Sequence, residues 1–183
     1  MKTERFFVKV KSGFCVLLFS NSIKEGFNMA DQTLGVDIGG VIINRTLKGD
    51  SYPPLPDVFE VLKNLREKKF GNIILVSHAD SDLRMKMLDW LLRQDFHRKT
   101  GISFLNIHFS RKRSEKVAIC RKYKVTHFID DRTEVLGHLL GSGIKSLYLF
   151  QGRQDEMKSN MHILPFIKQV ASWQEIAKEL LGE

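Results

Sequence analysis

The stretch "LGVDIGGVIIN" (residues 34–44) combines an apolar run, one carboxylate and two consecutive glycines. Its first residues have the pattern of a buried β-strand, and the glycine pair predicts a turn directly after it. Asp37 stands where the strand becomes the turn. An aspartate there either caps the turn or carries out chemistry at the end of the strand, and the rest of the sequence decides between the two.

Size and composition indicate one ordinary globular domain. The chain has 183 residues, of which 43% are hydrophobic and 27% charged, which is enough to bury a substantial core. Cys15 and Cys120 have neither metal-ligand nor redox spacing, and no zinc-binding pair occurs among the six histidines. This cysteine usage fits a reducing compartment, and we expect a cytoplasmic protein.

The net charge is compatible with nucleic acid or with anionic substrates and establishes neither. The net charge is +8, and the densest basic run is "FSRKRSEK" (residues 109–116). The run lacks the interleaved aromatic residues typical of nucleic-acid surfaces, so we expect a solvated loop and no nucleic-acid site.

The first 28 residues differ from the rest of the chain. Their apolar run, residues 14–19, is too short to cross a membrane. Lysines interrupt the apolar part before it, which makes a poor signal peptide. We therefore expect a peripheral or poorly ordered N-terminal extension over residues 1–28, a single domain over residues 29–183, and no association with membranes.

Beyond the extension, apolar segments alternate with amphipathic ones. Strands are predicted over residues 33–38, 72–77, 102–109, 125–130 and 144–150, and helices over residues 57–69, 81–94, 114–123, 133–140 and 172–181. Short apolar strands separated by helices predict an α/β fold, with a three-layer, Rossmann-like, doubly wound parallel sheet.

Polar residues fall at one edge of this predicted sheet. Asp37 and Ser77 end the first two strands, and Asp130 and Asp131 end the fourth. Lys116 lies near the start of the helix that leads into the fourth strand. Each residue alone has an ordinary explanation, as a turn residue, a helix cap or a solvated lysine. Because sites in open α/β sheets collect beyond the carboxyl ends of the strands, we expect the five to converge.

This order of residues resembles the four motifs of the haloacid dehalogenase-like (HAD) superfamily, over residues 34 to about 150. The most specific piece is "THFIDDRTEVL" (residues 126–136). The resemblance implies a Mg²⁺-dependent phosphatase that forms an aspartyl-phosphate, with Asp37 as the nucleophile. It implies further that Ser77 binds a phosphoryl oxygen and that Lys116 neutralises both nucleophile and phosphate.

The same resemblance implies a Mg²⁺ site. Its ligands would be Asp37, the backbone carbonyl of Gly39 and Asp131, with Asp130 beside them, a set of hard oxygen donors. Gly39 and Gly40 would let backbone N–H groups approach the phosphate closely.

One position departs from the HAD pattern. Gly39 stands where HAD phosphatases have a second aspartate that serves as general acid and base, help worth ~10²–10⁴ in rate. His78 and Asp80, which follow Ser77, are the nearest substitutes, although a rim histidine and a helix-capping aspartate are the simpler interpretations. The alternatives left open are a slow phosphatase and a HAD-like phosphate-binding or interaction protein without turnover.

Two other enzyme classes fit less well. "GVDIGG" also resembles the phosphate loop of actin-like sugar kinases, but those folds need a second lobe and a later glycine-rich segment. A dehalogenase could act without the second aspartate because halide needs no proton, but it would need a capped aromatic pocket.

The motif spacing leaves no room for a large cap domain. About 40 residues separate Asp37 from Ser77, and as many separate Ser77 from Lys116. The resemblance is therefore to capless members, whose open sites accept small or macromolecular phosphorylated substrates. Residues 44–56 could form a small flap, or a second copy of the chain could supply a lid.

Overall fold

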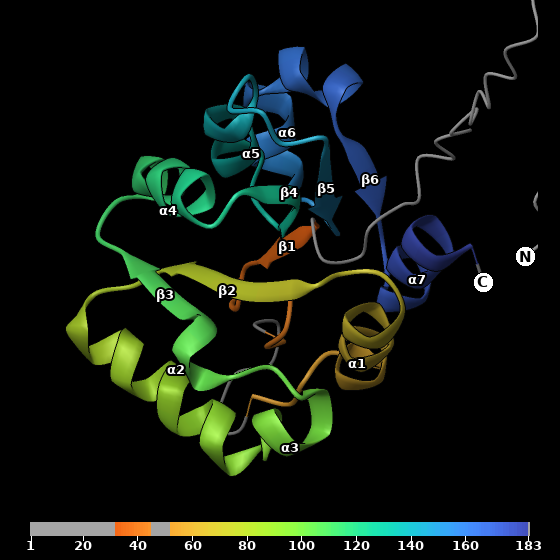
Figure 1. Ribbon diagram of the computed structural model, residues 1–183. Coiled ribbons are helices and arrows are strands. Elements are labelled where there is room, and N and C mark those ends of the chain that lie inside the picture. Colours follow the sequence, from red (N-terminus) through yellow and green to blue (C-terminus); the bar gives the residue numbers. More distant parts are fainter. Residues whose placement is uncertain (1–31, 45–51, 183) are drawn as a thin grey trace, which may run out of the picture.

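A six-stranded, all-parallel β-sheet forms the centre of the computed structural model, which describes residues 32–44 and 52–182 (Figure 1). The extension predicted over residues 1–28 lies outside these ranges. Across the sheet the strands are β3 (Ile107–Ser110), β2 (Asn72–His78), β1 (Thr33–Val36), β4 (Val125–Asp130), β5 (Ser146–Phe150) and β6 (Lys168–Val170). The α/β fold with a parallel sheet is thus confirmed.

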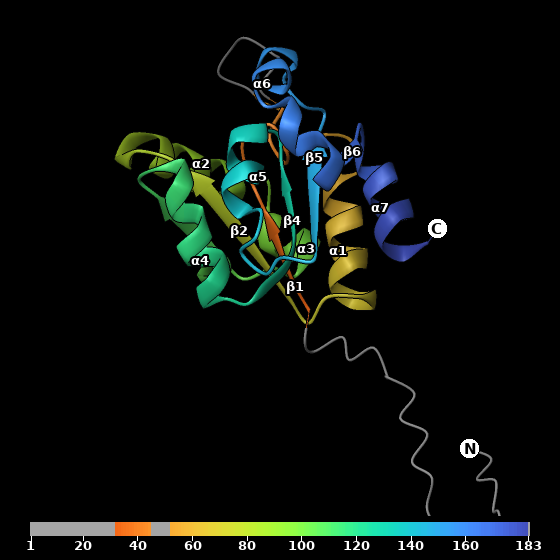
Figure 2. The same ribbon diagram turned by 90° about the horizontal axis from the view of Figure 1, so that it is seen from above.

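Helices cover both faces of the sheet, which gives three layers (Figures 1 and 2). One face carries α1 (Val58–Lys68), α2 (Ser81–Arg93), α3 (Phe96–Thr100) and α7 (Trp173–Leu181); the other carries α4 (Lys116–Lys122), α5 (Thr133–Leu139) and α6 (Gln154–Ser159). No element within the described ranges has the size of a cap domain, as expected. Among these residues, no helix has the length and apolar character that a membrane span requires.

The alternation of side chains along β2 shows why the sheet is buried on both sides. Ile73 and Leu75 belong to the core shared with α1 and α7, whereas Ile74 and Val76 belong to the core shared with α5. Successive residues of a strand point to opposite faces, so a strand covered on both faces must be apolar throughout.

Several element boundaries differ from the predicted ones. β3 begins at Ile107, five residues later than expected, because Phe104–Asn106 form a 3₁₀ turn. Ser103 starts that turn, and its hydroxyl accepts a hydrogen bond from the Leu105 N–H at 3.2 Å. The short elements β6, α3 and α6 were not predicted, since three to six residues carry too little periodicity.

The order of strands creates one switch point, between β1 and β4. The chain runs from β1 outward to β2 and β3, and then crosses back to β4 on the other side of β1. The N–H of Asp37 donates to the carbonyl of Ile129 at 2.9 Å, which ties the end of β1 to β4. A crevice opens beyond the carboxyl ends of strands at such a point.

The proposed flap is described only at its base. Ile43 pairs with Pro54 in an antiparallel bridge, and the Leu55 N–H donates to the carbonyl of Ile42 at 2.8 Å. Residues 45–51, on which the flap prediction depends, lie outside the described residues.

We predict an acid-sensitive contribution to stability from His127, which is buried in β4 with Phe70 edge-on at 5.1 Å. Burial, with a smaller contribution from Lys69, Lys145 and Lys168, lowers its pKa to about 4. As the pH falls, His127 is therefore protonated in the unfolded chain before it is protonated in the folded chain. The free energy of unfolding then falls as the pH drops from about 6.5 to about 4. We expect a loss of about 1–2 kcal/mol, since solvent screens the three lysines.

Urea unfolding between pH 7.5 and pH 4.5 measures this effect. The loss should shrink in His127→Gln and persist in His138→Gln, in which an exposed histidine is replaced. Equal pH dependence of the wild type and His127→Gln would contradict the prediction.

Candidate functional site

Three carboxylates gather at the switch point of the sheet. Asp37 follows β1, Asp130 ends β4 and Asp131 is the next residue. All three are buried, and one oxygen from each lies within 4.8 Å of the others. The convergence that the sequence predicted for these residues is therefore present.

Lys116 joins two of the carboxylates. Its Nζ lies 2.9 Å from Asp37 Oδ1 and 2.8 Å from Asp130 Oδ2. Only 2% of the residue is exposed, so the simple alternative of a solvated helix lysine is wrong. Hydrogen bonds between charged groups away from water are the strong ones.

The loop before Lys116 is shaped by one glutamate. A carboxylate oxygen of Glu115 accepts hydrogen bonds from the N–H groups of Arg111 and Lys112, at 2.9 and 3.2 Å. A 3₁₀ turn over Arg113–Glu115 then leads directly into α4. This folded loop starts the helix at the position from which Lys116 reaches inward.

The charges at this centre do not balance. Burial by itself lowers the pKa of Lys116, but Asp130 and Asp37 raise it, and the net effect is a raised pKa. Burial also raises the pKa of Asp130, Lys116 opposes that rise, and the like charges of Asp37 and Asp131 add to it. One buried ammonium against three buried carboxylates leaves negative charge that favours an added cation.

The donor set fits a hard divalent cation such as Mg²⁺. Carboxylate oxygens are the ligands that Mg²⁺ takes, and it retains several waters besides them. Arg153 approaches Asp131 from the side, with Nε 3.5 Å from Oδ2, and is itself partly exposed. Asp37, Asp130 and Asp131 are therefore the residues that could hold the ion.

We predict that Asp131→Asn raises the dissociation constant of Mg²⁺ about tenfold or more, because one of three converging charges is lost. Titration calorimetry on the wild type and the variant measures it. Glu134→Gln is the control, since Glu134 is an exposed acid that pairs with Arg113 outside the cluster. Equal Mg²⁺ affinity in the wild type and Asp131→Asn would show that Asp131 is not a ligand of Mg²⁺.

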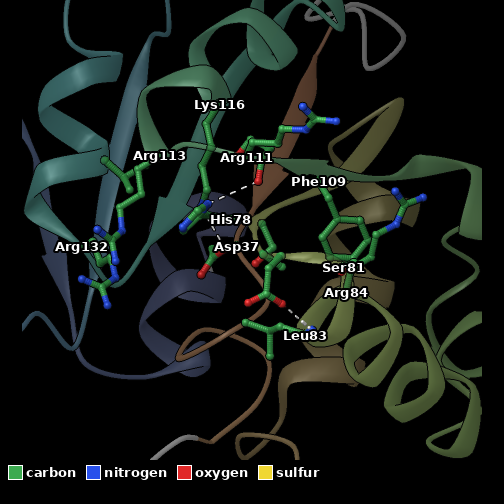
Figure 3. Close-up of a pocket in the computed structure, with 15 residues that line it drawn as sticks. Asp37, His78, Ser81, Leu83, Arg84, Phe109, Arg111, Arg113, Lys116 and Arg132 are labelled. Carbon is green, nitrogen blue, oxygen red and sulfur yellow. Dashed lines mark hydrogen bonds and ion pairs between the residues drawn. The ribbon is translucent and has the colours of Figure 1, made fainter.

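A pocket of about 790 Å³ opens at Asp37, the one carboxylate of the cluster that lines it (Figure 3). Asp37, Ser77, His78 and Lys116 line it, together with five residues from α2 and the segment before it and with Phe109 and Ser110 of β3. Ser77 is buried at the wall and does not cap α2, because Asp80 does so, accepting from the Leu83 N–H at 2.8 Å. A volume of this size suits a whole small-molecule ligand.

His78 has a defined hydrogen-bond partner. Its Nδ1 lies 3.3 Å from the carbonyl oxygen of Ser110. A carbonyl can only accept, so Nδ1 carries the hydrogen in this contact, and Nε2 is the acceptor nitrogen of the neutral ring. Asp80 is held by its capping role, so His78 is the better placed of the two substitutes considered for the missing acid.

The two glycines after Asp37 serve different purposes. Gly40 has φ +88°, and a Cβ on it would lie 2.5 Å from Asp131 Oδ2. Its N–H donates to the carbonyl of Ile43 at 2.9 Å, so it serves the turn, whereas the role predicted for it was contact with phosphate. Gly39 is buried and is not among the described residues with positive φ.

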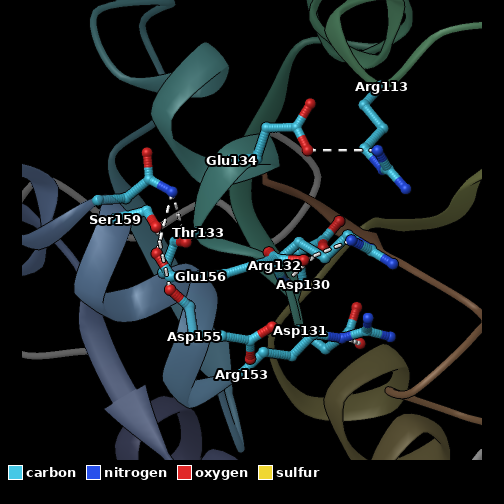
Figure 4. A network of polar contacts seen from close by, with 11 residues as sticks. Arg113, Asp130, Asp131, Arg132, Thr133, Glu134, Arg153, Asp155, Glu156 and Ser159 are labelled. Atoms are coloured by element: carbon cyan, nitrogen blue, oxygen red, sulfur yellow. Dashed lines mark hydrogen bonds and ion pairs between the residues drawn. The ribbon is translucent and has the colours of Figure 1, made fainter.

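Arginines around the pocket are the functional candidates that the sequence reasoning missed. The pocket is also lined by Arg84, Arg111, Arg113 and Arg132. Arg113 pairs with Glu134 and Arg132 with Glu156, in a polar network that extends to α6 (Figure 4). The basic run over residues 109–116 was the available signal, but it was interpreted as a solvated loop.

No protein-family model matches this chain, and no curated protein matches it either.

Proposed function

We propose that this protein is a HAD-like phosphoric ester hydrolase, dependent on Mg²⁺, in which Asp37 forms an aspartyl-phosphate. The observation that carries the proposal is the contact of Lys116 Nζ with both Asp37 and Asp130, at 2.9 and 2.8 Å, at the base of the pocket. A buried ammonium that holds a carboxylate at a pocket floor supports attack by that carboxylate on an anionic substrate.

Each residue of the site would have a separate role in the reaction. Lys116 offsets the repulsion between the Asp37 carboxylate and an incoming phosphate dianion. Ser77 can donate its hydroxyl hydrogen to a phosphoryl oxygen from the pocket wall. Mg²⁺, when bound by the carboxylate cluster, supplies further positive charge against the phosphoryl oxygens.

The reaction would take place in two displacements. In the first, an oxygen of Asp37 bonds to phosphorus, the ester P–O bond breaks, and its electron pair leaves with the alcohol oxygen, which takes a proton. In the second, a water oxygen bonds to phosphorus, the bond to Asp37 breaks and inorganic phosphate leaves. Protonated His78 would give the first proton, and its neutral Nε2 would accept one from the water.

Phosphate release from a panel of nucleotides, sugar phosphates and phosphopeptides, with Mg²⁺ present, tests the proposal. We predict turnover of at least one class and a fall of about 10³-fold or more in Asp37→Asn, which lacks the nucleophile. Asp82→Asn, at an exposed position of α2 that does not line the pocket, should keep full activity.

Glycine at position 39 favours a second candidate, a phosphate-binding protein without turnover. Beryllium fluoride with Mg²⁺ imitates the phosphorylated aspartate and separates the two. Binding of this complex without any release of phosphate from the panel would favour the binding protein. Absence of both would contradict both candidates.

A further inference from the structure

The wall of the pocket carries more positive charge than one phosphate requires. Five cationic side chains line it, against the carboxylates of Asp37 and Asp80: Arg84, Arg111, Arg113, Lys116 and Arg132. In Figure 3, Arg113 and Arg132 lie on one side of the opening, and Arg84 and Arg111 lie on the other, with Phe109.

Three of the five cations already have acidic partners. Lys116 is held by Asp37 and Asp130. Arg113 Nη1 lies 3.3 Å from Glu134, and Arg132 Nη1 lies 2.5 Å from Glu156. Their charges are thus largely balanced within the chain.

Arg84 and Arg111 differ from these three. Neither makes an ion pair with a residue in the described ranges. The guanidinium of Arg84 lies over the ring of Phe109, 5.3 Å from its centroid, which orients it along the pocket wall. The backbone of Arg111 is fixed by its N–H bond to Glu115, at 2.9 Å.

We propose that Arg84 and Arg111 form a second anion subsite, so that the preferred substrate is a phosphomonoester carrying another phosphate group. The inference rests on the proposed function for the identity of the first phosphate site. The phosphate to be cleaved lies at Asp37 and Lys116, and the second is bound by the two guanidinium groups, whose planar donors match phosphate oxygens. A pocket of about 790 Å³ has room for both groups and their linker.

Calorimetry on full-length Asp37→Asn with Mg²⁺ tests the subsite without turnover. The probes are adenosine 5′-monophosphate and adenosine 3′,5′-bisphosphate. We expect the bisphosphate to bind about tenfold or more tightly, since each charge-assisted contact adds to affinity. Adding Arg84→Gln and Arg111→Gln should bring the ratio of the two dissociation constants close to one.

The matched control removes two charges elsewhere. Arg98 on α3 and Arg121 on α4 are exposed and do not line the pocket, so Arg98→Gln with Arg121→Gln should preserve the ratio. Equal binding of the two probes by Asp37→Asn, or a ratio that survives Arg84→Gln with Arg111→Gln, overturns the subsite. Lack of binding by either probe overturns it as well.

Separate measurements identify the source of the second phosphate and test the proposed function. A 5′-phosphorylated oligonucleotide is compared with the bisphosphate. If the oligonucleotide binds more tightly, with the same arginine dependence, the ligand of the subsite is the end of a nucleic acid. If it binds more weakly, the ligand is a small bisphosphate. If the wild type releases no phosphate while the arginine-dependent ratio is present, the hydrolase proposal fails and the subsite stands. If the wild type releases phosphate but the arginine-dependent ratio is absent, the subsite fails and the hydrolase proposal stands.

Discussion

Lys116→Met should lower the free energy of unfolding by about 3 kcal/mol at neutral pH without divalent cation, because it leaves buried carboxylates uncompensated. Methionine retains the aliphatic part of the side chain, so the change isolates the charge. This differs from the small stability effect expected of a solvated lysine, and the reason is that Lys116 is 2% exposed. The same variant should weaken binding of beryllium fluoride at least about tenfold. Urea unfolding and calorimetry measure the two effects.

Two further variants identify the cause. Lys112→Met removes an exposed lysine from the loop before Lys116 and should leave both quantities nearly unchanged. Adding Asp130→Asn to Lys116→Met should recover part of the lost stability, since Asp130 is fully buried and is then neutral. A Lys116→Met protein as stable as the wild type would show that the buried ion pairs contribute nothing.

Gly39→Asp should raise the rate of phosphate release by about 10²–10⁴-fold, because it supplies the general acid and base that the site lacks. The backbone permits the change, since Gly39 does not have the positive φ that disfavours L-residues. Steady-state kinetics on the best substrate of the panel measures the gain. A folded Gly39→Asp variant that binds Mg²⁺ and is no faster would argue that the site is not organised for phosphoryl transfer.

Gly40→Ala is the matched control for the neighbouring position. With φ +88° and Asp131 Oδ2 only 2.5 Å from the place of a Cβ, even a methyl group must displace the carboxylate. The variant should lose stability and Mg²⁺ affinity and should gain no activity. The two adjacent glycines should therefore respond in opposite directions.

The sequence was sufficient to predict the layers of the fold and the centre of the site. Uniformly apolar strands such as β2 are typical of a parallel sheet, and Asp37, Asp130 and Asp131 could be placed together because parallel strands end at one edge. Lys116 was expected beside them because it starts the helix that leads into β4. Its burial could not be predicted, because helix periodicity does not say which way the first turn faces.

The arginines of the pocket could not be predicted in this way. Arg84 comes from the first turns of α2 and Arg111 from the loop after β3. Their approach depends on the orientation of α2 over the sheet and on the fold of the loop around Glu115. Neither property is encoded in a short repeat, and an exposed arginine has the same appearance in the sequence whether or not a pocket lies beneath it.

The central place of β1 in the sheet sets the order in which the site can be completed during synthesis. One edge of β1 pairs with β2, which ends at His78, but the other pairs with β4, which begins at Val125. A chain still emerging from the ribosome must therefore keep the backbone N–H and C=O groups on one edge of β1 unpaired until about ninety further residues have been added, a separation typical of slowly forming contacts. Asp37 is among the first residues of the domain to be made, yet it meets Asp130 only when β4 has been added.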